Sequence, residues 1–249
     1  MNKKLIAFVD KLPGWLTTSE GSFLEQAAKT TKKLDGVIVE IGSFCGKSTI
    51  WLSQGKSKIF AIDPHKGNVG DGEKYPPTFT AFLKNIKTAE ADKYIEPIVK
   101  PSEKAAKGWK QQIKVLFIDG LHDEFNATRD FNLWSKHVVD GGIIAIHDSY
   151  KRWCGSEKMA IKKILLSNGF SKVGAIDSIT YGVKGKSTGM QKVKRSLTAM
   201  HLIGNVYLNR LKILFIHGPE IISKSIKGNI NQQLQALILT TSMTAAYML

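Results

Sequence analysis

Short apolar runs alternate with stretches of helical periodicity along the first 184 residues of the chain. The runs are rich in Val and Ile, as expected of strands that are covered on both faces of a sheet. This alternation predicts a mostly parallel sheet with helices on both sides. We expect seven strands, at Val37–Ile41, Ile59–Ile62, Ile95–Val99, Val115–Ile118, Ile143–Ile146, Lys172–Ile176 and Thr180–Val183.

Helical patterns fall between these runs and complete the expected α/β fold. The gap between Ile176 and Thr180 is too short for a crossover, so the last two strands should be antiparallel. Phe125, Phe131 and Trp134 should face the core from one of the helices. The whole pattern predicts a Rossmann-like, doubly wound sheet. The expected helices are Lys47–Ser53, Thr78–Ala89, Ser102–Gln111, Glu124–His137 and Glu157–Leu166.

The first strand runs into a turn with two glycines. Glu40, Gly42 and Gly46 form the pattern acid-x-Gly-x-x-x-Gly. Glycine at 42 permits a positive φ, and glycine at 46 would let a ligand approach the main chain closely. The second strand ends in Asp63, where an acid is placed to accept the hydroxyls of a ribose. The two strand ends together predict a nucleoside-binding site.

The spacing of the glycines separates three classes of ligand. The dinucleotide fingerprint needs glycines where this chain has Phe44 and Lys47, so NAD is disfavoured. The phosphate-binding loop of kinases is one residue longer than the segment from Gly42 to Ser48, although the Gly-Lys-Ser ending leaves that class open. The observed spacing resembles the first motif of Rossmann-like methyltransferases that use S-adenosylmethionine.

Two further acids follow the fourth and fifth expected strands. Asp119 and Asp148 should lie at the sheet edge that also carries Glu40 and Asp63, because the carboxyl ends of parallel strands meet there. A buried acid is costly unless a ligand, a metal ion or a hydrogen bond satisfies it. Two carboxylates with water suit Mg²⁺. His122 is a candidate general base for a substrate hydroxyl.

The residue before Asp148 is a histidine. Because successive side chains of a strand point to opposite faces, we expect His147 to point away from Asp148 and to have a structural role.

Three stretches carry a more specific resemblance: residues 115–124 with Ile-Asp-Gly-x-His, residues 130–134, and residues 141–149 with Gly-Gly-Ile-Ile and His-Asp. They resemble a bacterial family of class I methyltransferases whose relatives methylate sugar hydroxyls in macrolide antibiotics. The resemblance covers about Leu16 to Lys184. It implies S-adenosylmethionine as the cofactor and O-methylation of a sugar or another small hydroxylated acceptor.

The resemblance also implies a set of site residues. Relatives hold magnesium with acids at the positions of Asp119 and Asp148, where catechol enzymes have Asp-Asn and macrolide enzymes often have Asp-Asp. This chain instead has His147-Asp148-Ser149. Catalysis is assigned to His122, Asp119 and Asp148, and the metal to Asp119 and Asp148. Cofactor binding is assigned to Glu40, Gly42, Ser43, Gly46, Ser48, Asp63, Ser102 and Asp119.

The C-terminal quarter differs in charge from the rest. The chain has 249 residues and a net charge of +15, and residues 185–249 hold eight Lys or Arg and one acid. We therefore expect a methyltransferase domain over residues 1–184, with an N-terminal helical segment, and a basic helical extension over residues 185–249. An apolar stripe predicts an amphipathic helix: Val193, Leu197, Met200, Gly204, Leu208, Leu211 and Phe215.

Two interpretations of this stripe are open. It could pack on the core or on a second subunit, or it could lie on an anionic membrane surface. In the second case the attraction would come from Lys192, Lys194, Arg195, Arg210 and Lys212.

Other features limit the function class. We expect a cytoplasmic enzyme, because no secretory signal or apolar run of membrane-spanning length is evident. Cys45 and Cys154 form no disulfide framework or zinc pattern and should be reduced. Nucleic acid is disfavoured, since no recognition motif accompanies the basic charge. The alternative to an enzyme is a binding protein that kept the methyltransferase fold and uses its basic tail to contact a membrane or a partner.

Overall fold

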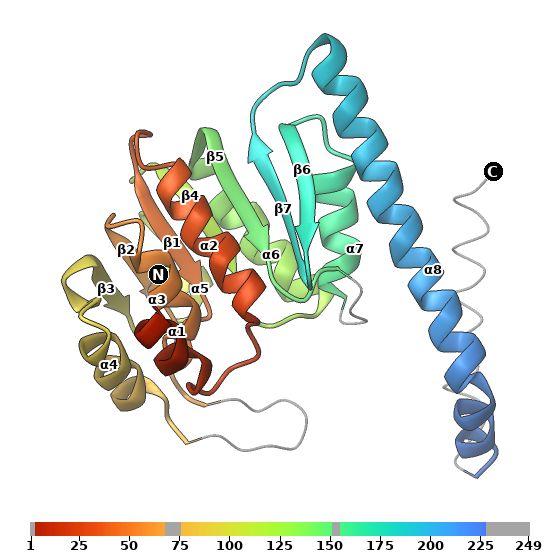
Figure 1. Cartoon of the computed structure of the whole chain (residues 1–249), viewed down its shortest axis with the longest axis horizontal. Helices are drawn as coiled ribbons and strands as arrows, with labels where there is room; N and C mark the ends of the chain where they lie inside the picture. The colour runs from red at the N-terminus through yellow and green to blue at the C-terminus, as the bar shows by residue number, and fades with distance from the viewer. Residues whose placement is uncertain (1–2, 68–75, 151–154, 228–249) are drawn as a thin grey trace. The chain divides into compact units, whose positions relative to one another are not determined.

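A computed structural model describes residues 3–67, 76–150 and 155–227, with side chains up to residue 209 (Figure 1). Cys154, most of the glycine-rich loop after Asp63 and the segment Ile230–Leu249 lie outside the described residues. Contacts between Cα atoms divide the chain into two units, Met1–Ile203 and Gly204–Leu249. The account below concerns the first unit.

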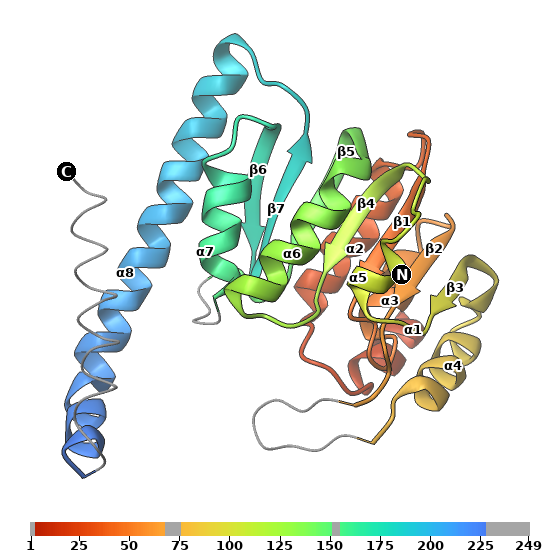
Figure 2. The same ribbon diagram turned by 180° about the vertical axis from the view of Figure 1, so that it is seen from behind.

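The first unit is built on one sheet of seven strands in the order β3-β2-β1-β4-β5-β7-β6 (Figures 1 and 2). Neighbouring strands are parallel from β3 to β5, whereas β7 is antiparallel to both β5 and β6. This arrangement confirms the predicted fold class and the antiparallel final pair. The strands are β1 (Val37–Ile41), β2 (Ile59–Ile62), β3 (Ile95–Ile98), β4 (Ile113–Ile118), β5 (Val138–Ile146), β6 (Phe170–Ile176) and β7 (Ile179–Lys184).

Helices cover both faces of the sheet. α2 and α3 lie on one face, and α6 and α7 lie on the other (Figures 1 and 2). The helices are α1 (Lys3–Asp10), α2 (Thr18–Thr30), α3 (Lys47–Ser53), α4 (Phe79–Thr88), α5 (Ser102–Ala105), α6 (Glu124–Trp134), α7 (Ser156–Ala160) and α8 (Gly189–Lys227). Short 3₁₀ turns at Asp92–Tyr94 and Ser135–His137 and a π-helical turn at Ile161–Leu165 join them.

Two of the predicted helical features differ from the structure. α5 is a single turn and does not reach Gln111, because Gly108 adopts a left-handed φ of 76° that a helix cannot contain. Phe125 does not face the core: its side chain is 74% exposed, whereas Phe131 and Trp134 are buried as expected. Phe125 precedes Phe131 by six residues, which is not a whole number of helical turns.

The N-terminal part of α8 packs through a face that the pattern did not single out. Arg195, Ala199 and Leu202 are buried, whereas Val193, Leu197 and Met200 are more than half exposed. Of the interpretations left open for the apolar stripe, packing on the core of the same chain does not hold for these three residues, and a second subunit or a membrane surface stays open. In the described part of the chain, no helix combines the length and the apolar character needed to cross a bilayer.

Arg195 explains why this face is buried. Its guanidinium donates hydrogen bonds to the backbone oxygens of Leu165 (3.3 Å) and Ser167 (2.6 Å), at the end of the π-helical turn. Arg195 is 8% exposed and is held inside the fold. It is therefore not available for the electrostatic attraction to a membrane that its position in the basic tail suggested.

Candidate functional site

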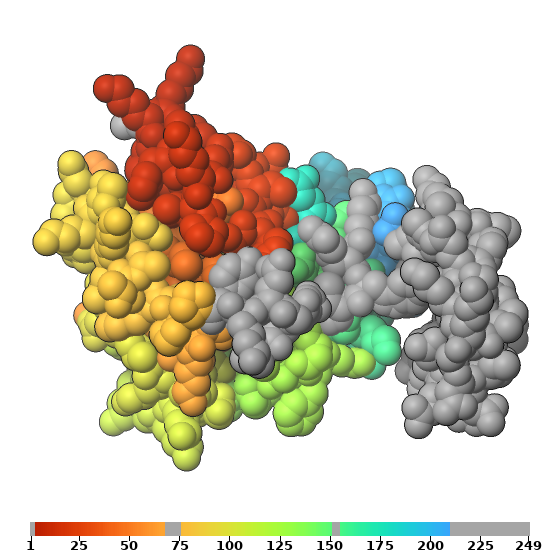
Figure 3. Space-filling view, turned by 90° about the horizontal axis from the view of Figure 1, so that it is seen from below, coloured from red at the N-terminus to blue at the C-terminus, as the bar shows by residue number. Residues whose placement is uncertain are grey.

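The carboxyl ends of β1, β2, β4 and β5 open into a cavity of about 890 Å³. In an open α/β sheet this is the edge at which ligands bind. N-terminal residues 13–16 also line the cavity, and the N-terminal segment (red) and the region around α4 (yellow) surround this edge in the space-filling view (Figure 3). The cavity brings together most of the predicted site residues: Gly42, Ser43, Ser48, Asp63, Ser102, Asp119, His122 and Asp148.

The two glycines of the first turn have different roles. Gly42 has a φ of 89°, and a Cβ atom there would lie 2.1 Å from the backbone oxygen of Asp119. Glycine is thus required where the turn after β1 crosses the end of β4. A Cβ at Gly46 would instead meet Phe82 and Ile86 of α4 at 3.3 Å, and Gly46 does not line the cavity. Gly46 also has a left-handed φ of 87°, so both the backbone conformation and the packing against α4 favour glycine there, and a close ligand approach at this position stays a prediction.

Glu40 lies beneath this turn and does not line the cavity. Its side chain is completely buried and accepts a hydrogen bond of 2.5 Å from the hydroxyl of Thr49. Burial, together with the negative charges of Asp119 and Asp63, raises the pKa of Glu40 to about 8, although hydrogen bonds from Ser48 and Thr49 oppose the shift. Glu40 is thus buried outside the cavity wall and bonded to α3, and its assignment to cofactor binding stays a prediction.

Asp63 holds two loops in place at the cavity wall. Its carboxylate accepts hydrogen bonds from the backbone nitrogens of Phe44 (2.9 Å) and His65 (2.6 Å). Phe44 and His65 both have positive φ, at 42° and 51°, so Asp63 stabilises a strained pair of turns. Each carboxylate oxygen retains acceptor capacity for a ligand hydroxyl.

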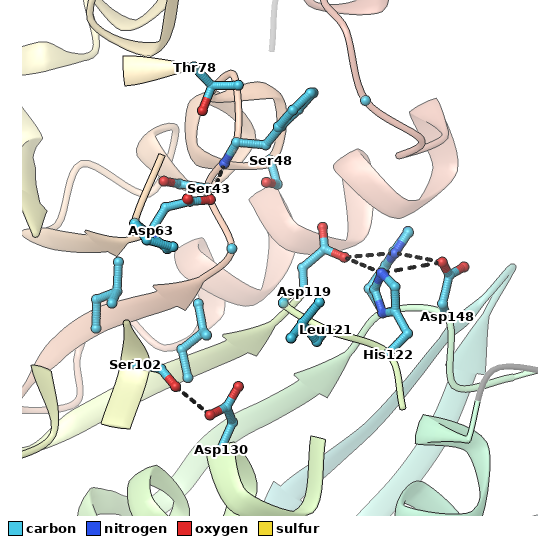
Figure 4. Close-up of a pocket in the computed structure, with 18 of the residues that line it drawn as sticks. Ser43, Ser48, Asp63, Thr78, Ser102, Asp119, Leu121, His122, Asp130 and Asp148 are labelled. Atoms are coloured by element: carbon cyan, nitrogen blue, oxygen red, sulfur yellow. Dashed lines mark hydrogen bonds and ion pairs between the residues drawn. The ribbon is translucent and has the colours of Figure 1, made fainter. Parts of the chain in front are cut away.

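A polar pair that we did not predict lies at the opposite wall. The hydroxyl of Ser102 donates a short hydrogen bond to Asp130 of α6, and Arg129 Nε lies 3.5 Å from the same carboxylate (Figure 4). Burial raises the pKa of Asp130, although the bond from Ser102 opposes the shift. Arg129 also lines the cavity. The only hint of this pair in the sequence was that Asp130 stands next to Phe131, a residue predicted to face the core.

Two serines from the first turn complete this part of the wall. Ser43 is buried, and its hydroxyl has no hydrogen-bond partner among the described residues. Ser48, in the first turn of α3, is also buried and lines the cavity. The Ser43 hydroxyl is therefore placed to bind a polar group of a ligand, whereas the Ser48 hydroxyl already donates to Glu40.

A cluster of imidazoles and carboxylates occupies the far end of the cavity (Figure 4). His122 Nε2 lies 3.8 Å from Asp119 Oδ1 and 3.6 Å from Asp148 Oδ2. His147 Nδ1 lies 2.9 Å from Asp119 Oδ1 and 3.7 Å from Asp148 Oδ2. Asp119 does not cap the following helix, because Asp123 is the N-cap of α6. Both carboxylates are thus directed at the two imidazoles.

The expectation that His147 points away from Asp148 is wrong. Asp148 has a φ of 49°, in the left-handed region, so the alternation of the strand ends before its side chain. His147 and Asp148 therefore meet at the same cluster. His147 belongs to the site and is only 3% exposed.

Glu20 of α2, which we did not assign to the site, reaches this cluster. Its Oε2 lies 3.4 Å from His147 Nε2 and accepts a hydrogen bond from the backbone nitrogen of Thr17 at 2.9 Å. Its Oε1 accepts bonds from the backbone nitrogen (2.9 Å) and hydroxyl (2.6 Å) of Ser178. Glu20 thus joins α2, the turn between β6 and β7, and His147.

The charges of this network shift the pKa values of its members. Burial opposes protonation of His147, but the negative charge of Asp119, with Glu20 and Asp148, outweighs it and raises the pKa of His147 to about 11. Burial would raise the pKa of Glu20, but hydrogen bonds from His147, Ser178 and Thr17 outweigh it and lower the pKa to about 2. The cluster therefore stabilises positive charge at its centre.

The residues present are suited to hold a cation. Asp119, His122 and His147 each offer a ligand atom, and these three atoms all lie within 4.8 Å of one another. Asp148, which we expected to share the metal with Asp119, is directed at the same two imidazole nitrogens. The donor set thus includes nitrogen, in contrast to the all-carboxylate pair expected from the resemblance.

Comparisons with known proteins agree with this architecture. Residues 39–149 match the family model Methyltransf_24, described as a methyltransferase domain. Uncharacterized protein R132 of Acanthamoeba polyphaga mimivirus is 33% identical over 148 residues, which are 57% of this chain and 65% of that protein. The chain thus matches slightly less than two thirds of that relative.

Solved structures share the fold at low sequence identity. A putative O-methyltransferase from Klebsiella pneumoniae has a TM-score of 0.58 and 15% identity over 74% of this chain and 91% of its own. The O-methyltransferase from Bacillus cereus, in complex with SAH, has a TM-score of 0.56 and 16% identity over 74% and 92%. The apo structure of CalS11, a TDP-rhamnose 3'-O-methyltransferase of calicheamicin biosynthesis, has a TM-score of 0.52 and 14% identity over 74% and 93%.

The family match covers the first turn, the Asp63 loop and the imidazole–carboxylate cluster. Residues 39–149 are therefore similar to the methyltransferase domain that the Methyltransf_24 model describes, and the chain has the fold of the solved O-methyltransferases above.

Proposed function

We propose that the protein transfers the methyl group of S-adenosylmethionine to a hydroxyl oxygen of a sugar or another small hydroxylated acceptor. The observation that carries this proposal is a single cavity with a nucleoside-type wall at Asp63 and Ser102 and a proton-accepting cluster at its other end. The family match and the sugar O-methyltransferase among the similar folds support the same reaction class.

The cofactor would bind along the turn after β1. Asp63 would accept hydrogen bonds from the ribose hydroxyls, and Ser102 would lie near the base. Buried Ser43 offers a hydroxyl that makes no hydrogen bond within the described residues and could bind a polar group of the cofactor. When bound, S-adenosylmethionine supplies a methyl group on a positively charged sulfur.

The cluster would handle the proton of the acceptor. As the acceptor oxygen forms its bond to the methyl carbon, the carbon–sulfur bond breaks and S-adenosylhomocysteine leaves. The hydroxyl proton must then pass to a base. His122 is the proposed acceptor in the cation-free protein, because it is 34% exposed at the cavity wall, and Asp119 and Asp148 would stabilise the imidazolium that forms.

Calorimetry with S-adenosylhomocysteine tests the proposal directly. The wild-type protein should bind it, and Asp63→Ala should bind at least about tenfold more weakly, because a charge-assisted acceptor contributes roughly 1.5–3 kcal/mol. Asp63→Asn is the matched variant, since it removes the charge and keeps one acceptor oxygen for the backbone of Phe44 or His65. An absence of binding by the wild type would instead favour a binding protein that kept the fold without the chemistry.

The exposed face of α8 supports a second proposal, a peripheral contact with an anionic lipid surface. Met190, Val193, Leu197 and Met200 form an exposed apolar face, and Lys192 and Lys194 are exposed beside it. Each such lysine contributes about 1 kcal/mol of attraction near an anionic surface. This contact would place the enzyme near lipid-linked acceptors.

Flotation with vesicles tests this contact. The full chain should float with anionic vesicles at low salt and release at high salt, and it should not float with neutral ones. Replacing Val193 and Leu197 together by Ser should abolish flotation. Phe125→Ser is the control, because Phe125 is an exposed apolar residue on α6, far along the chain from α8. Equal flotation of all three proteins would contradict the contact.

A further inference from the structure

We propose that Asp119, His122 and His147 form a site for a first-row transition-metal dication, of the Zn²⁺ or Co²⁺ class, in preference to Mg²⁺. This proposal depends on the proposed function in one respect: the cation would lie at the end of the cavity where the acceptor is proposed to bind. It differs from the all-oxygen magnesium site that the resemblance implies, because two of the three donors are imidazole nitrogens.

The first argument is the state of His147 Nδ1. This nitrogen belongs to a side chain that is 3% exposed, and it lies 2.9 Å from Asp119 Oδ1 without making a hydrogen bond of acceptable geometry. A cation bound between His147 and Asp119 would take the place of the proton that now pairs these two groups.

The second argument is the support that holds His147 from behind. Histidines that bind metals usually direct their other ring nitrogen at a carboxylate, which fixes the ring. His147 Nε2 lies 3.4 Å from Glu20 Oε2, and Glu20 is itself fixed by two hydrogen bonds from Ser178. The chain thus provides the carboxylate–imidazole pair that a metal ligand needs, on the side away from the cavity.

The third argument is the chemistry of the donors. Mg²⁺ prefers oxygen ligands and water, whereas imidazole suits Zn²⁺, Co²⁺, Ni²⁺ and Fe²⁺. Bonds of about 2.0–2.2 Å to nitrogen and oxygen place neighbouring ligand atoms about 3–3.5 Å apart. The His147–Asp119 and His122–Asp119 separations of 2.9 Å and 3.8 Å bracket that range. Small side-chain rotations would therefore suffice to bind the ion.

Binding of the cation would change the roles of two residues. It would use the lone pair of His122, so His122 could no longer accept the proton of the acceptor hydroxyl. Asp148 Oδ2, 3.6 Å and 3.7 Å from the two imidazole nitrogens, would then take the role of base. The bound cation would supply Lewis-acid polarisation of the acceptor oxygen.

Cobalt spectroscopy tests the site without reference to activity. The full chain, treated with a chelator and dialysed, is titrated with Co²⁺, whose visible absorption reports its ligands, and then with Zn²⁺ or Mg²⁺ as competitors. We expect one equivalent of Co²⁺ to bind, Zn²⁺ to displace it, and a hundredfold excess of Mg²⁺ to leave it bound. His147→Gln should weaken Co²⁺ binding at least tenfold, and Glu20→Gln by about 10–100-fold.

Controls separate this proposal from the proposed function. His201→Gln, an exposed histidine of α8, should bind Co²⁺ as the wild type does, and circular dichroism confirms that each variant is folded. Displacement of Co²⁺ by equimolar Mg²⁺, unchanged affinity in His147→Gln, or an intense thiolate-to-cobalt band would overturn the site. S-adenosylhomocysteine binding is measured on the same samples: if it persists while Co²⁺ selectivity fails, only the cation site is wrong.

Discussion

The buried Glu40 carboxyl makes the stability of the ligand-free protein depend on pH. Its pKa rises from 4.5 to about 8 in the folded state, mainly because burial disfavours the charged form. Between these two values the folded protein binds a proton that the unfolded chain has released. The free energy of unfolding should therefore fall as the pH rises from 4.5 to 8 and should be independent of Glu40 below and above that window.

The magnitude follows from the shift. At about 1.4 kcal/mol per pKa unit, the change from pH 5 to pH 7 is roughly 3 kcal/mol, as an upper bound. Glu40→Gln should abolish this contribution, because the amide is neutral at every pH and its oxygen can still accept the hydrogen bond from Thr49. The amide nitrogen would take the place of Oε1, which has no hydrogen-bond partner among the described residues.

Urea unfolding at pH 5 and pH 7 measures the effect. The wild type should lose up to about 3 kcal/mol more than Glu40→Gln between the two conditions, and the difference cancels the contributions of groups that titrate in both proteins. Glu96→Gln is the control, since Glu96 is exposed on β3 and pairs with Lys58 at the surface. Equal losses in the wild type and Glu40→Gln would refute the reasoning.

Two further predictions follow from the packing. Gly42→Ala should destabilise the protein by about 2 kcal/mol or more, because its Cβ would lie 2.1 Å from the Asp119 oxygen at a left-handed φ, and urea unfolding would measure the loss. Arg195→Met should cost about 1–3 kcal/mol by leaving the Leu165 and Ser167 oxygens without their donor, whereas Lys194→Met should be near neutral; equal effects would contradict the anchoring role.

Most of the sheet could be predicted because its strands are continuous apolar runs. Val37–Ile41 and Ile59–Ile62 have no polar alternation to confuse with a helix, and a parallel sheet requires both of their faces to be buried. The acids that end these runs mark the ligand edge for the same reason. The local pattern and the tertiary structure agree for these strands, so the sequence alone was sufficient to place them and the edge at which they end.

The faces of the helices were harder to predict because a buried face can include polar residues. The α8 pattern drew attention to Val193 and Leu197, yet the helix packs through Arg195 and Ala199. Arg195 is buried because backbone oxygens from the turn after α7 accept its hydrogen bonds. Periodicity counts apolar residues, and it gives no weight to a cation whose partners lie elsewhere in the chain.

Of the two histidines in the cluster, only His122 was assigned to the site from the sequence. Strand alternation placed His147 on the wrong face because it assumes extended backbone throughout, and Asp148 departs from it with a positive φ. Aspartate is among the residues that tolerate this conformation, but nothing in the sequence shows that it adopts it. Glu20 lies 127 residues before His147, a pairing that only the folded chain reveals.

The carboxylates at this edge of the sheet are satisfied in different ways, and the differences locate the chemistry. Glu40 is held in its neutral form by burial, and Asp63 accepts hydrogen bonds from two backbone nitrogens. Asp119 and Asp148 both lie within 4 Å of the ring nitrogens of His122 and His147. The two carboxylates of this cluster therefore favour a bound positive charge. A dication there would supply that charge beside the acceptor hydroxyl.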